Sequence, residues 1–168
     1  MLMKPNSDIS APLSLYKETV RPEWIDYNGH LNMAYYLLAF DHATDALFDW
    51  IGLGAEYAQT TDGTTFTLEA HLSYIAEVGE NDVLRFETHL FDFDEKRIHY
   101  AHSMYHDKEN YLAATNELMT LHVSQSKRRA AAIPTNALDR LGLIKAAHEG
   151  LPQPPGMSAN MGLNRNKL

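Results

Sequence analysis

The side chains of this sequence that could carry out chemistry together lie in one short stretch, residues 20–32. The carboxylate of Asp26 stands a few residues before Met33, where a run of apolar residues begins. A carboxylate close to the start of a helix can act as a general base or as a nucleophile. The backbone N–H at Met33 could then receive the oxyanion that forms when a carbonyl group is attacked. The stretch is therefore a candidate site for attack on a carbonyl compound.

The other polar residues of this stretch favour turns and helix caps, which leaves a structural interpretation open. Asn28 and Gly29 are typical of turns, and Asn32 is a typical N-cap residue. Asp26 and Asn28 could serve only to accept hydrogen bonds from turn and cap N–H groups. His30 could likewise be a hydrogen-bonded loop residue. Spacing alone does not separate this interpretation from the catalytic one.

Aromatic residues bracket the same stretch and suggest a kind of ligand. Trp24, Tyr27 and Tyr35 lie within it or just after it, and Tyr36 and Trp50 follow in the apolar segment. Aromatic faces bind quaternary ammonium groups. Core packing is the simpler interpretation of Tyr36 and Trp50.

Two groups from later in the chain could contribute to a site. Glu69 and His71 are two residues apart in an alternating segment, so they share one face of a predicted strand and could reach one pocket. Arg128 is at the centre of the basic run 127–129 in a chain whose formal net charge is -8. Such a run could bind nucleotide phosphates. Solvated surface positions explain all three side chains equally well.

Composition and charge argue against several classes of function. The net charge of -8 disfavours broad binding to nucleic acid or to an anionic membrane, and no apolar run approaches the roughly 18 residues that span a bilayer. The chain has no cysteine, and its histidines lack the paired spacing of a helical metal site. His99 and His102 should face opposite sides of a strand. We therefore expect no metal, cofactor, nucleic-acid or membrane partner, and a location in the cytoplasm.

Periodicity divides the chain into a long helix, a series of strands and a shorter helix. Apolar residues at steps of three and four predict helices over 33–51 and 135–148. Alternation predicts one strand before the polar stretch and four consecutive strands after the long helix. These strands are expected over 13–20, 65–74, 83–93, 98–105 and 111–124. Residues 1–12, 59–65 and 151–168 are expected to form a loose lead-in, a loop and a mobile tail.

This order of elements predicts an α+β fold in a single domain over 1–168, with its core over about 13–130. One apolar face of a curved antiparallel sheet needs a cover, and the long helix is the obvious candidate. The residues expected to fill the concave side of the sheet are Tyr35, Tyr36, Phe40 and Trp50. The shorter helix and the tail, about 135–168, are expected outside this core.

The stretch from Asp26 to Asn32 resembles a loop of a known family. Its sequence, Asp-Tyr-Asn-Gly-His-Leu-Asn, is similar to the Asp-x-x-Gly-His-x-Asn loop of hotdog-fold acyl-CoA thioesterases of the 4-hydroxybenzoyl-CoA thioesterase type. The resemblance covers residues 13 to about 130, because that family has the same order of strand, long helix and four strands. It implies a hotdog fold, in which a curved antiparallel sheet wraps around one long central helix, and hydrolysis of a thioester.

A longer match narrows the resemblance within that family. Residues 20–30, 43–46, 69–71 and 94–97 are similar to thioesterases associated with carnitine breakdown, some of which are fused to L-carnitine dehydrogenase. Those proteins are taken to hydrolyse betainyl-CoA. The trimethylammonium group of that substrate agrees with the aromatic residues around Asp26 and with the acidic Glu69.

The resemblance implies roles for individual residues. Asp26 matches the catalytic carboxylate, which attacks the thioester directly or activates water, and the N–H at Met33 would polarise the thioester carbonyl. Asn32 and His30 would shape the loop. The implied partners are a small-molecule acyl-CoA substrate and further copies of the chain. The site is expected at an interface of a homodimer or homotetramer, where two sheets join edge to edge.

Three alternatives stay open at this point. The substrate could be a different acyl- or aroyl-CoA. A hotdog hydratase or dehydratase would carry Asp-x-Asn-Pro-x-His, with its catalytic groups five apart, whereas Asp26 and His30 are four apart and Gly29 replaces the proline. A non-catalytic module that binds an acyl-CoA would show tight binding without turnover, and the presence of Asp26 counts against it.

Overall fold

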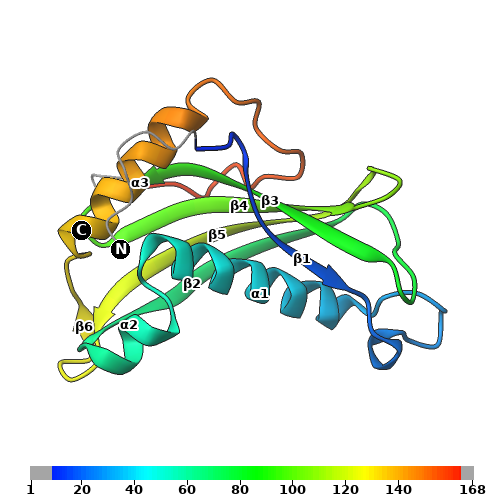
Figure 1. Cartoon of the computed structure of the whole chain (residues 1–168), viewed down its shortest axis with the longest axis horizontal. Coiled ribbons are helices and arrows are strands. Elements are labelled where there is room, and N and C mark those ends of the chain that lie inside the picture. The colour runs from blue at the N-terminus through cyan, green and yellow to red at the C-terminus, as the bar shows by residue number, and fades with distance from the viewer. Residues whose placement is uncertain (1–8, 164–168) are drawn as a thin grey trace.

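The computed structural model describes residues 9–163, and in it a curved antiparallel sheet wraps around one long helix (Figure 1). The strands are β1 (Leu13–Thr19), β2 (Gly63–Tyr74), β3 (Val83–Phe93), β4 (Arg97–His106), β5 (Leu112–Ser124) and β6 (Arg129–Ala130). They lie in the order β1-β3-β4-β5-β2, and the short β6 also pairs with β5. The helices are α1 (Met33–Ile51), α2 (Ala55–Thr60) and α3 (Thr135–His148), with a 3-10 turn η1 (Pro22–Trp24). The predicted α+β architecture is confirmed.

Local sequence signals set both ends of α1. The Asn32 side chain accepts a hydrogen bond from the N–H of Ala34 (2.9 Å), as expected of an N-cap residue. At the other end Gly52 adopts a left-handed conformation with φ 86°, and its N–H donates to the carbonyl of Phe48 (2.9 Å). The predicted helix over 33–51 is therefore confirmed at both ends.

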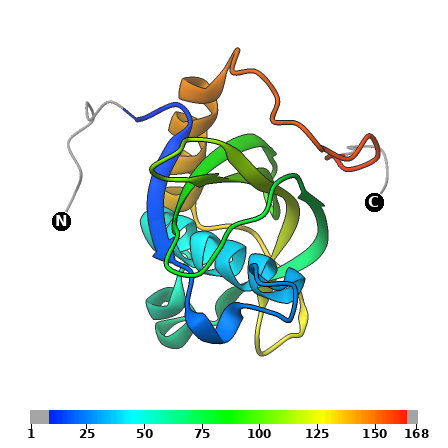
Figure 2. The same cartoon turned by 90° about the vertical axis from the view of Figure 1, so that its right-hand side faces the viewer.

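The sheet curls around α1 (Figure 2). The buried side chains of the helix join two core clusters. The C-terminal half of α1 packs with α3 and β3, whereas the N-terminal half packs with Trp24 and Leu31. Tyr36 and Phe40 lie in the second cluster as predicted. Tyr35 and Trp50, which were also predicted to fill the concave side, are only partly buried and pack against the two clusters.

The segment after α1 differs from the loop predicted over 59–65. Residues Ala55–Thr60 form α2, and β2 begins at Gly63 rather than at residue 65. The hydroxyls of Thr60 and Thr61 donate to carbonyls one helical turn earlier (2.7 and 2.8 Å) and so terminate the short helix. This side-chain capping gives no hydrophobic period, which is why the sequence pattern did not reveal the helix.

The described part of the predicted mobile tail, residues 151–163, lies along the convex face of the sheet, opposite α1 (Figures 1 and 2). The N–H of Ser158 donates to the buried carboxylate of Glu117 (2.5 Å), which also pairs with His99 Nε2 (2.7 Å). The hydroxyl of Thr115 donates to the carbonyl of Pro155 (3.1 Å). These contacts hold the tail in place. Residues 1–8 of the predicted lead-in and 164–168 of the tail lie outside the described residues.

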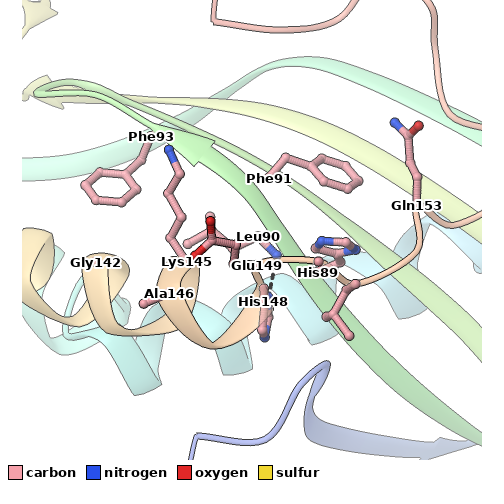
Figure 3. Close-up of a pocket in the computed structure, with 12 residues that line it drawn as sticks. His89, Leu90, Phe91, Phe93, Gly142, Lys145, Ala146, His148, Glu149 and Gln153 are labelled. Atoms are coloured by element: carbon pink, nitrogen blue, oxygen red, sulfur yellow. Dashed lines mark hydrogen bonds between the residues drawn. The ribbon is translucent and has the colours of Figure 1, made fainter.

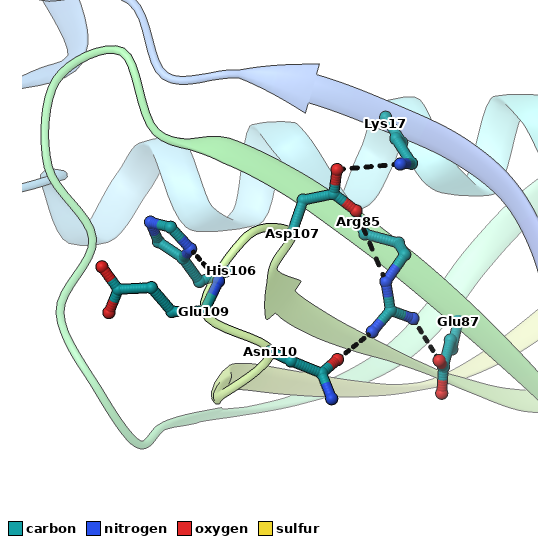
Figure 4. Close-up of polar contacts among 7 residues, drawn as sticks. All are labelled: Lys17, Arg85, Glu87, His106, Asp107, Glu109 and Asn110. Atoms are coloured by element: carbon teal, nitrogen blue, oxygen red, sulfur yellow. Dashed lines mark hydrogen bonds and ion pairs between the residues drawn. The ribbon is translucent and has the colours of Figure 1, made fainter.

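The turn between β4 and β5 is tied to β1 and β3 by a polar network (Figure 4). Lys17 donates to Asp107 (2.8 Å), and Arg85 donates to Asn110 (2.7 Å) and also pairs with Glu87. This network lies on the strand ends and fixes the hairpin that was predicted at residues 106–110.

No helix described in residues 9–163 has the length and apolar character needed to cross a membrane.

His102 of β4 is completely buried between the sheet and α1, and no charged side chain among residues 9–163 pairs with it. Its Nε2 lies 3.0 Å from the hydroxyl of Thr44 in α1, and its Nδ1 lies 2.8 Å from the hydroxyl of Thr88 in β3. Burial lowers the pKa of the imidazole to about 3, so this histidine is neutral in the folded protein. As predicted, His99 faces the other side of the strand, where it contacts Glu117.

We expect the free energy of unfolding to fall between pH 7 and pH 5 because of His102. The unfolded chain takes up the proton near pH 6.5, whereas the folded chain takes it up only near pH 3, so acid favours unfolding across this range. His102 accounts for about 2 kcal/mol of the loss at pH 5, to be measured by urea unfolding at the two pH values, and the buried His89, whose pKa is lowered to about 4, adds to the total. His102→Gln, which cannot take up this proton, should remove most of the His102 contribution. Equal pH dependence in both proteins would contradict the assignment.

Candidate active site

Residues 25–31 form a tight hairpin with Asp26 in its turn. Ile25 bridges to Leu31, and the N–H of Gly29 donates to the carbonyl of Asp26 (3.0 Å). Oδ1 of Asp26 accepts from the N–H of Asn28 (2.8 Å). Gly29 has φ 84°, which a residue without Cβ adopts without strain. The structural role considered for Asp26 is therefore present, but it uses only one of the two carboxylate oxygens.

Two buried apolar side chains anchor this hairpin in the core. Trp24 is 3% exposed and Leu31 is 1% exposed. The N–H of Leu31 donates to the carbonyl of Val78 (2.9 Å), and the N–H of Asn32 donates to the carbonyl of Trp24 (2.9 Å). The hairpin is consequently fixed in position relative to the start of α1.

Two groups that an ester-hydrolysing site needs have no hydrogen-bond partner among residues 9–163. These are Oδ2 of Asp26 and the backbone N–H of Met33. The N–H groups of Ala34 and Tyr35 are already taken by the side chain and the carbonyl of Asn32. Met33 therefore offers its N–H at the positive end of the α1 dipole, where negative charge is stabilised.

The hairpin, the first turn of α1 and the end of β2 surround a cavity of about 470 Å³. Six of the predicted site residues line it, namely Asp26, Tyr27, Asn28, His30, Asn32 and Met33. Sequence reasoning missed most of the opposite wall, which consists of Tyr36, Tyr74, Ile75, Ala76 and Glu77. Only the contact between the end of β2 and the start of α1 brings these residues to the site, and no local sequence pattern encodes that contact.

Two tyrosine hydroxyls hold this wall against the helix. The Tyr74 hydroxyl donates to the carbonyl of Met33 (3.1 Å), and the Tyr36 hydroxyl donates to the carbonyl of Ala76 (3.3 Å). Burial raises the pKa of both hydroxyls, so both remain neutral donors. At the rim, Nε2 of His30 lies 3.9 Å from the carboxylate of Glu77.

The other predicted site residues lie outside the cavity lining. Trp24 stacks on Tyr35, with ring centroids 5.5 Å apart, and the guanidinium of Arg21 covers it at 4.9 Å. Glu69 and His71 pair in register with Met119 and Glu117, so they lie on the convex face of β2, away from α1. Arg128 lies in the exposed turn between β5 and β6. One copy of the chain does not bring Glu69, His71 or Arg128 to Asp26.

A larger cavity of about 730 Å³ lies between β3 and α3 (Figure 3). Its His148 already uses both ring nitrogens, because Nδ1 accepts from the N–H of Leu90 (3.0 Å) and Nε2 donates to the carbonyl of Ser10 (3.3 Å). Burial lowers the pKa of the neighbouring His89 to about 4, and Lys145 is paired with Asp92. Within the described residues no grouping of His, Asp or Glu suits a metal ion. The Asp26 cavity is therefore the better candidate for hydrolysis.

Gly29→Ala is expected to lower the free energy of unfolding by about 1 kcal/mol, because a Cβ strains a left-handed backbone. A Cβ at this position would meet no atom within 4 Å, so the strain is the whole effect. Gly142→Ala is the matched control, since Gly142 is equally open but lies inside α3. It should stabilise by about 0.5–1 kcal/mol. Urea unfolding measures both, and effects of the same sign would contradict the conformational explanation.

Comparison with known proteins places this site in a family. Residues 20–141 match the Thioesterase-like superfamily. The chain is 40% identical over 155 residues to a betainyl-CoA thioesterase from Pseudomonas aeruginosa, and the match covers 92% of this chain and 98% of that protein. It is 36% identical over 146 residues to an L-carnitine dehydrogenase/betainyl-CoA thioesterase from Agrobacterium fabrum, covering 86% of this chain and 30% of that longer protein.

A solved structure agrees with this assignment. A Staphylococcus aureus protein in complex with CoA has a TM-score of 0.82 to this chain at 25% sequence identity, covering 94% of this chain and 99% of that chain. The sheet wrapped around α1 is thus the predicted hotdog fold, and the hairpin that carries Asp26 lies inside the matched region. The chain belongs to the Thioesterase-like superfamily, as the hairpin motif predicted.

Proposed function

We propose that the chain hydrolyses betainyl-CoA to glycine betaine and CoA. Both named relatives carry betainyl-CoA thioesterase in their names, and one of them matches along almost its whole length. The CoA-bound neighbour supports a CoA ester as ligand. The observation that carries the proposal is that the Asp26 carboxylate and the start of α1 at Met33 share one cavity.

The proposed chemistry uses these two groups together. The thioester carbonyl oxygen accepts a hydrogen bond from the Met33 N–H, which stabilises negative charge as the carbonyl carbon becomes tetrahedral. In one course Asp26 takes a proton from water, hydroxide adds to the carbonyl carbon, the C–S bond breaks and the CoA thiolate takes up a proton. In the other course Asp26 attacks the carbonyl carbon, CoA leaves, and water hydrolyses the resulting anhydride.

Replacement of Asp26 tests the proposal directly. Asp26→Asn should lower kcat for betainyl-CoA by about a hundredfold or more, because an amide neither takes up the proton nor attacks the carbonyl. The amide oxygen can still accept from the Asn28 N–H, so the unfolding midpoint should change little. Asp139→Asn, on the exposed face of α3, is the control for loss of one charge. Thiol release measures the rates.

Two results would contradict this assignment at different levels. Wild-type activity in Asp26→Asn would remove Asp26 from the mechanism. Hydrolysis of betainyl-CoA no faster than that of acetyl-CoA or benzoyl-CoA would make the substrate wrong and leave the enzyme class in place. A single turnover in oxygen-labelled water would separate the two courses, since label in the Asp26 side chain requires the anhydride.

We propose further that two copies assemble through β2. This strand is 12 residues long, lies at one edge of the sheet and leaves its outer row of backbone groups unpaired within the described chain. Large apolar side chains on β2, just after it and on the first turns of α1 are 37% to 66% exposed, namely Met33, Leu37, Leu38, Phe66, Leu68, Tyr74 and Ile75. A second copy pairing along this edge would cover them.

Antiparallel pairing about a two-fold axis gives Arg128 a place in the site. It sets the Gly63 end of one β2 opposite the Tyr74 end of the other. The turn that carries Arg128 lies at the Gly63 end, because Gly63 pairs with Ser124 and the N–H of Gln125 donates to the carbonyl of Asp62 (2.8 Å). Arg128 of one copy is then proposed to bind the CoA phosphates of a substrate in the Asp26 cavity of the other. Glu69 and His71 lie near the axis.

Mixed dimers test this shared site. Arg128→Ala and Asp26→Asn should each be poorly active on their own. When the two variants are unfolded, mixed and refolded together, about a quarter of wild-type kcat/KM should return, since half of the dimers then hold one intact site. The rate is measured with betainyl-CoA well below KM. Lys127→Ala mixed with Arg128→Ala is the control, because both changes then affect the same turn. Activity of the first mixture equal to the mean of its parents would contradict a site shared between copies.

A further inference from the structure

We propose that Tyr36, Tyr74 and Glu77 form a binding site for a trimethylammonium group, which selects the acyl moiety of the substrate. The inference deepens the proposed function and rests on it. It assigns substrate selection to the wall of the cavity opposite the hairpin, whereas the sequence pointed to Trp24, Tyr35 and Glu69.

Distance along the substrate restricts where such a site can lie. In a betainyl thioester only one methylene separates the ammonium nitrogen from the carbonyl carbon. Once the carbonyl oxygen accepts from the Met33 N–H, the ammonium must lie against the first turn of α1. Tyr74 meets this requirement because its hydroxyl donates to the carbonyl of Met33 itself (3.1 Å), and Tyr36 lies three residues further along the same helix.

The two rings form a fixed aromatic corner. Their centroids are 5.3 Å apart and their planes meet at 86°. Each hydroxyl is held by a backbone carbonyl, Ala76 for Tyr36 and Met33 for Tyr74, so neither ring is free to rotate away. Both residues line the cavity, and Tyr74 is 49% exposed whereas Tyr36 is buried. A cation over such rings is attracted by their negative faces, and the attraction grows as water is excluded.

The charge of the cavity also favours a cation. None of the twelve lining residues is Lys or Arg, whereas Asp26 and Glu77 both carry carboxylates. Glu77 lies three residues after the end of β2 and lines the same cavity as the two rings, and its carboxylate lies 3.9 Å from His30 Nε2 at the rim. A neutral acyl group would gain nothing from this arrangement, and a carboxylated one would be repelled.

Two of the aromatic residues that the sequence favoured, Trp24 and Tyr35, are unsuited to this role. Tyr35 stacks on the Trp24 indole with an interplanar angle of 13°, and Arg21 covers the indole at 4.9 Å. The guanidinium is itself a cation, so Trp24 already has a cation–π partner. Glu69 lies on the convex face, where its register partner is Met119. In one copy of the chain, a cation in the cavity would therefore bind beside Tyr74.

An isosteric pair of substrates isolates the charge. In 3,3-dimethylbutanoyl-CoA a carbon atom replaces the ammonium nitrogen of betainyl-CoA, so the two esters share their shape and differ by one charge. The ammonium group also withdraws electrons from the carbonyl, so the ratio of the two kcat/KM values is divided by the ratio of the two rates of hydrolysis by hydroxide without protein. The wild-type protein should show a corrected ratio of at least about ten in favour of betainyl-CoA. Tyr74→Leu should reduce this ratio to within about threefold, whereas Tyr74→Phe, which keeps the ring, should retain most of it.

Two acidic variants form a matched comparison. Glu77→Gln should lower the ratio about threefold or more, with a smaller effect at high salt. Glu80→Gln removes the same charge from the same exposed segment but does not line the cavity, so its ratio should stay at the wild-type value. Ratios unchanged in both Tyr74→Leu and Glu77→Gln would overturn the inference. Because the readout is a ratio within each variant, a general loss of activity does not imitate the effect.

Binding of the free acids separates failure of this inference from failure of the proposed function. The methyl signals of glycine betaine should shift upfield on binding to wild-type protein because of the ring currents, and less so with Tyr74→Leu, whereas 3,3-dimethylbutanoate should bind more weakly. This result without hydrolysis of either ester would keep the site and reject the thioesterase proposal. Hydrolysis of both esters by the wild-type protein without a preference for betainyl-CoA would reject this site and keep the thioesterase proposal.

Discussion

The depth at which α1 lies in the curve of the sheet determines where every group of the cavity is placed. Ala39 and Ala43 face the sheet with 0% and 2% exposure, and their small side chains allow a close approach. The start of the same helix is held by the Tyr74 hydroxyl and by the anchored hairpin. A shift of α1 would therefore move the Met33 N–H relative to both walls at once. The geometry of the site follows from the packing of the core.

Much of this arrangement could be predicted because local chemistry encodes it. Asn32 and Gly52 set the ends of α1 through a side-chain cap and a left-handed backbone. Strands β3, β4 and β5 begin and end within one residue of the predicted bounds, since alternating apolar residues and turn residues mark them. The hairpin motif brought Asp26, His30 and Met33 together because these residues are close in sequence and one turn positions them all.

The rest depends on contacts between segments far apart in the chain. Strict alternation along β2 would place Phe66 on the same face as Ala70 and Tyr74, but a bulge between Thr67 and Glu69 moves Phe66 to the convex face. Tyr74 pairs with Ala114 beyond this bulge, and its hydroxyl reaches the carbonyl of Met33 in α1. Tyr74 and Glu77 therefore stayed outside the predicted site. The sequence predicts a mobile tail because its prolines and glycines give no sign of the hydrogen bonds that hold it.

The segment that covers the convex face, residues 151–163, is synthesised after the strands that it covers. A chain emerges from its N-terminus, so β5 is complete before the segment that covers it exists. A sheet without that segment lacks the N–H of Ser158 on the carboxylate of Glu117, which is 1% exposed in the finished fold. Such a sheet would present this carboxylate, beside His99, at the middle of its outer surface. Such a charge opposes sheet-to-sheet stacking during the interval when an unfinished β protein is most prone to aggregate.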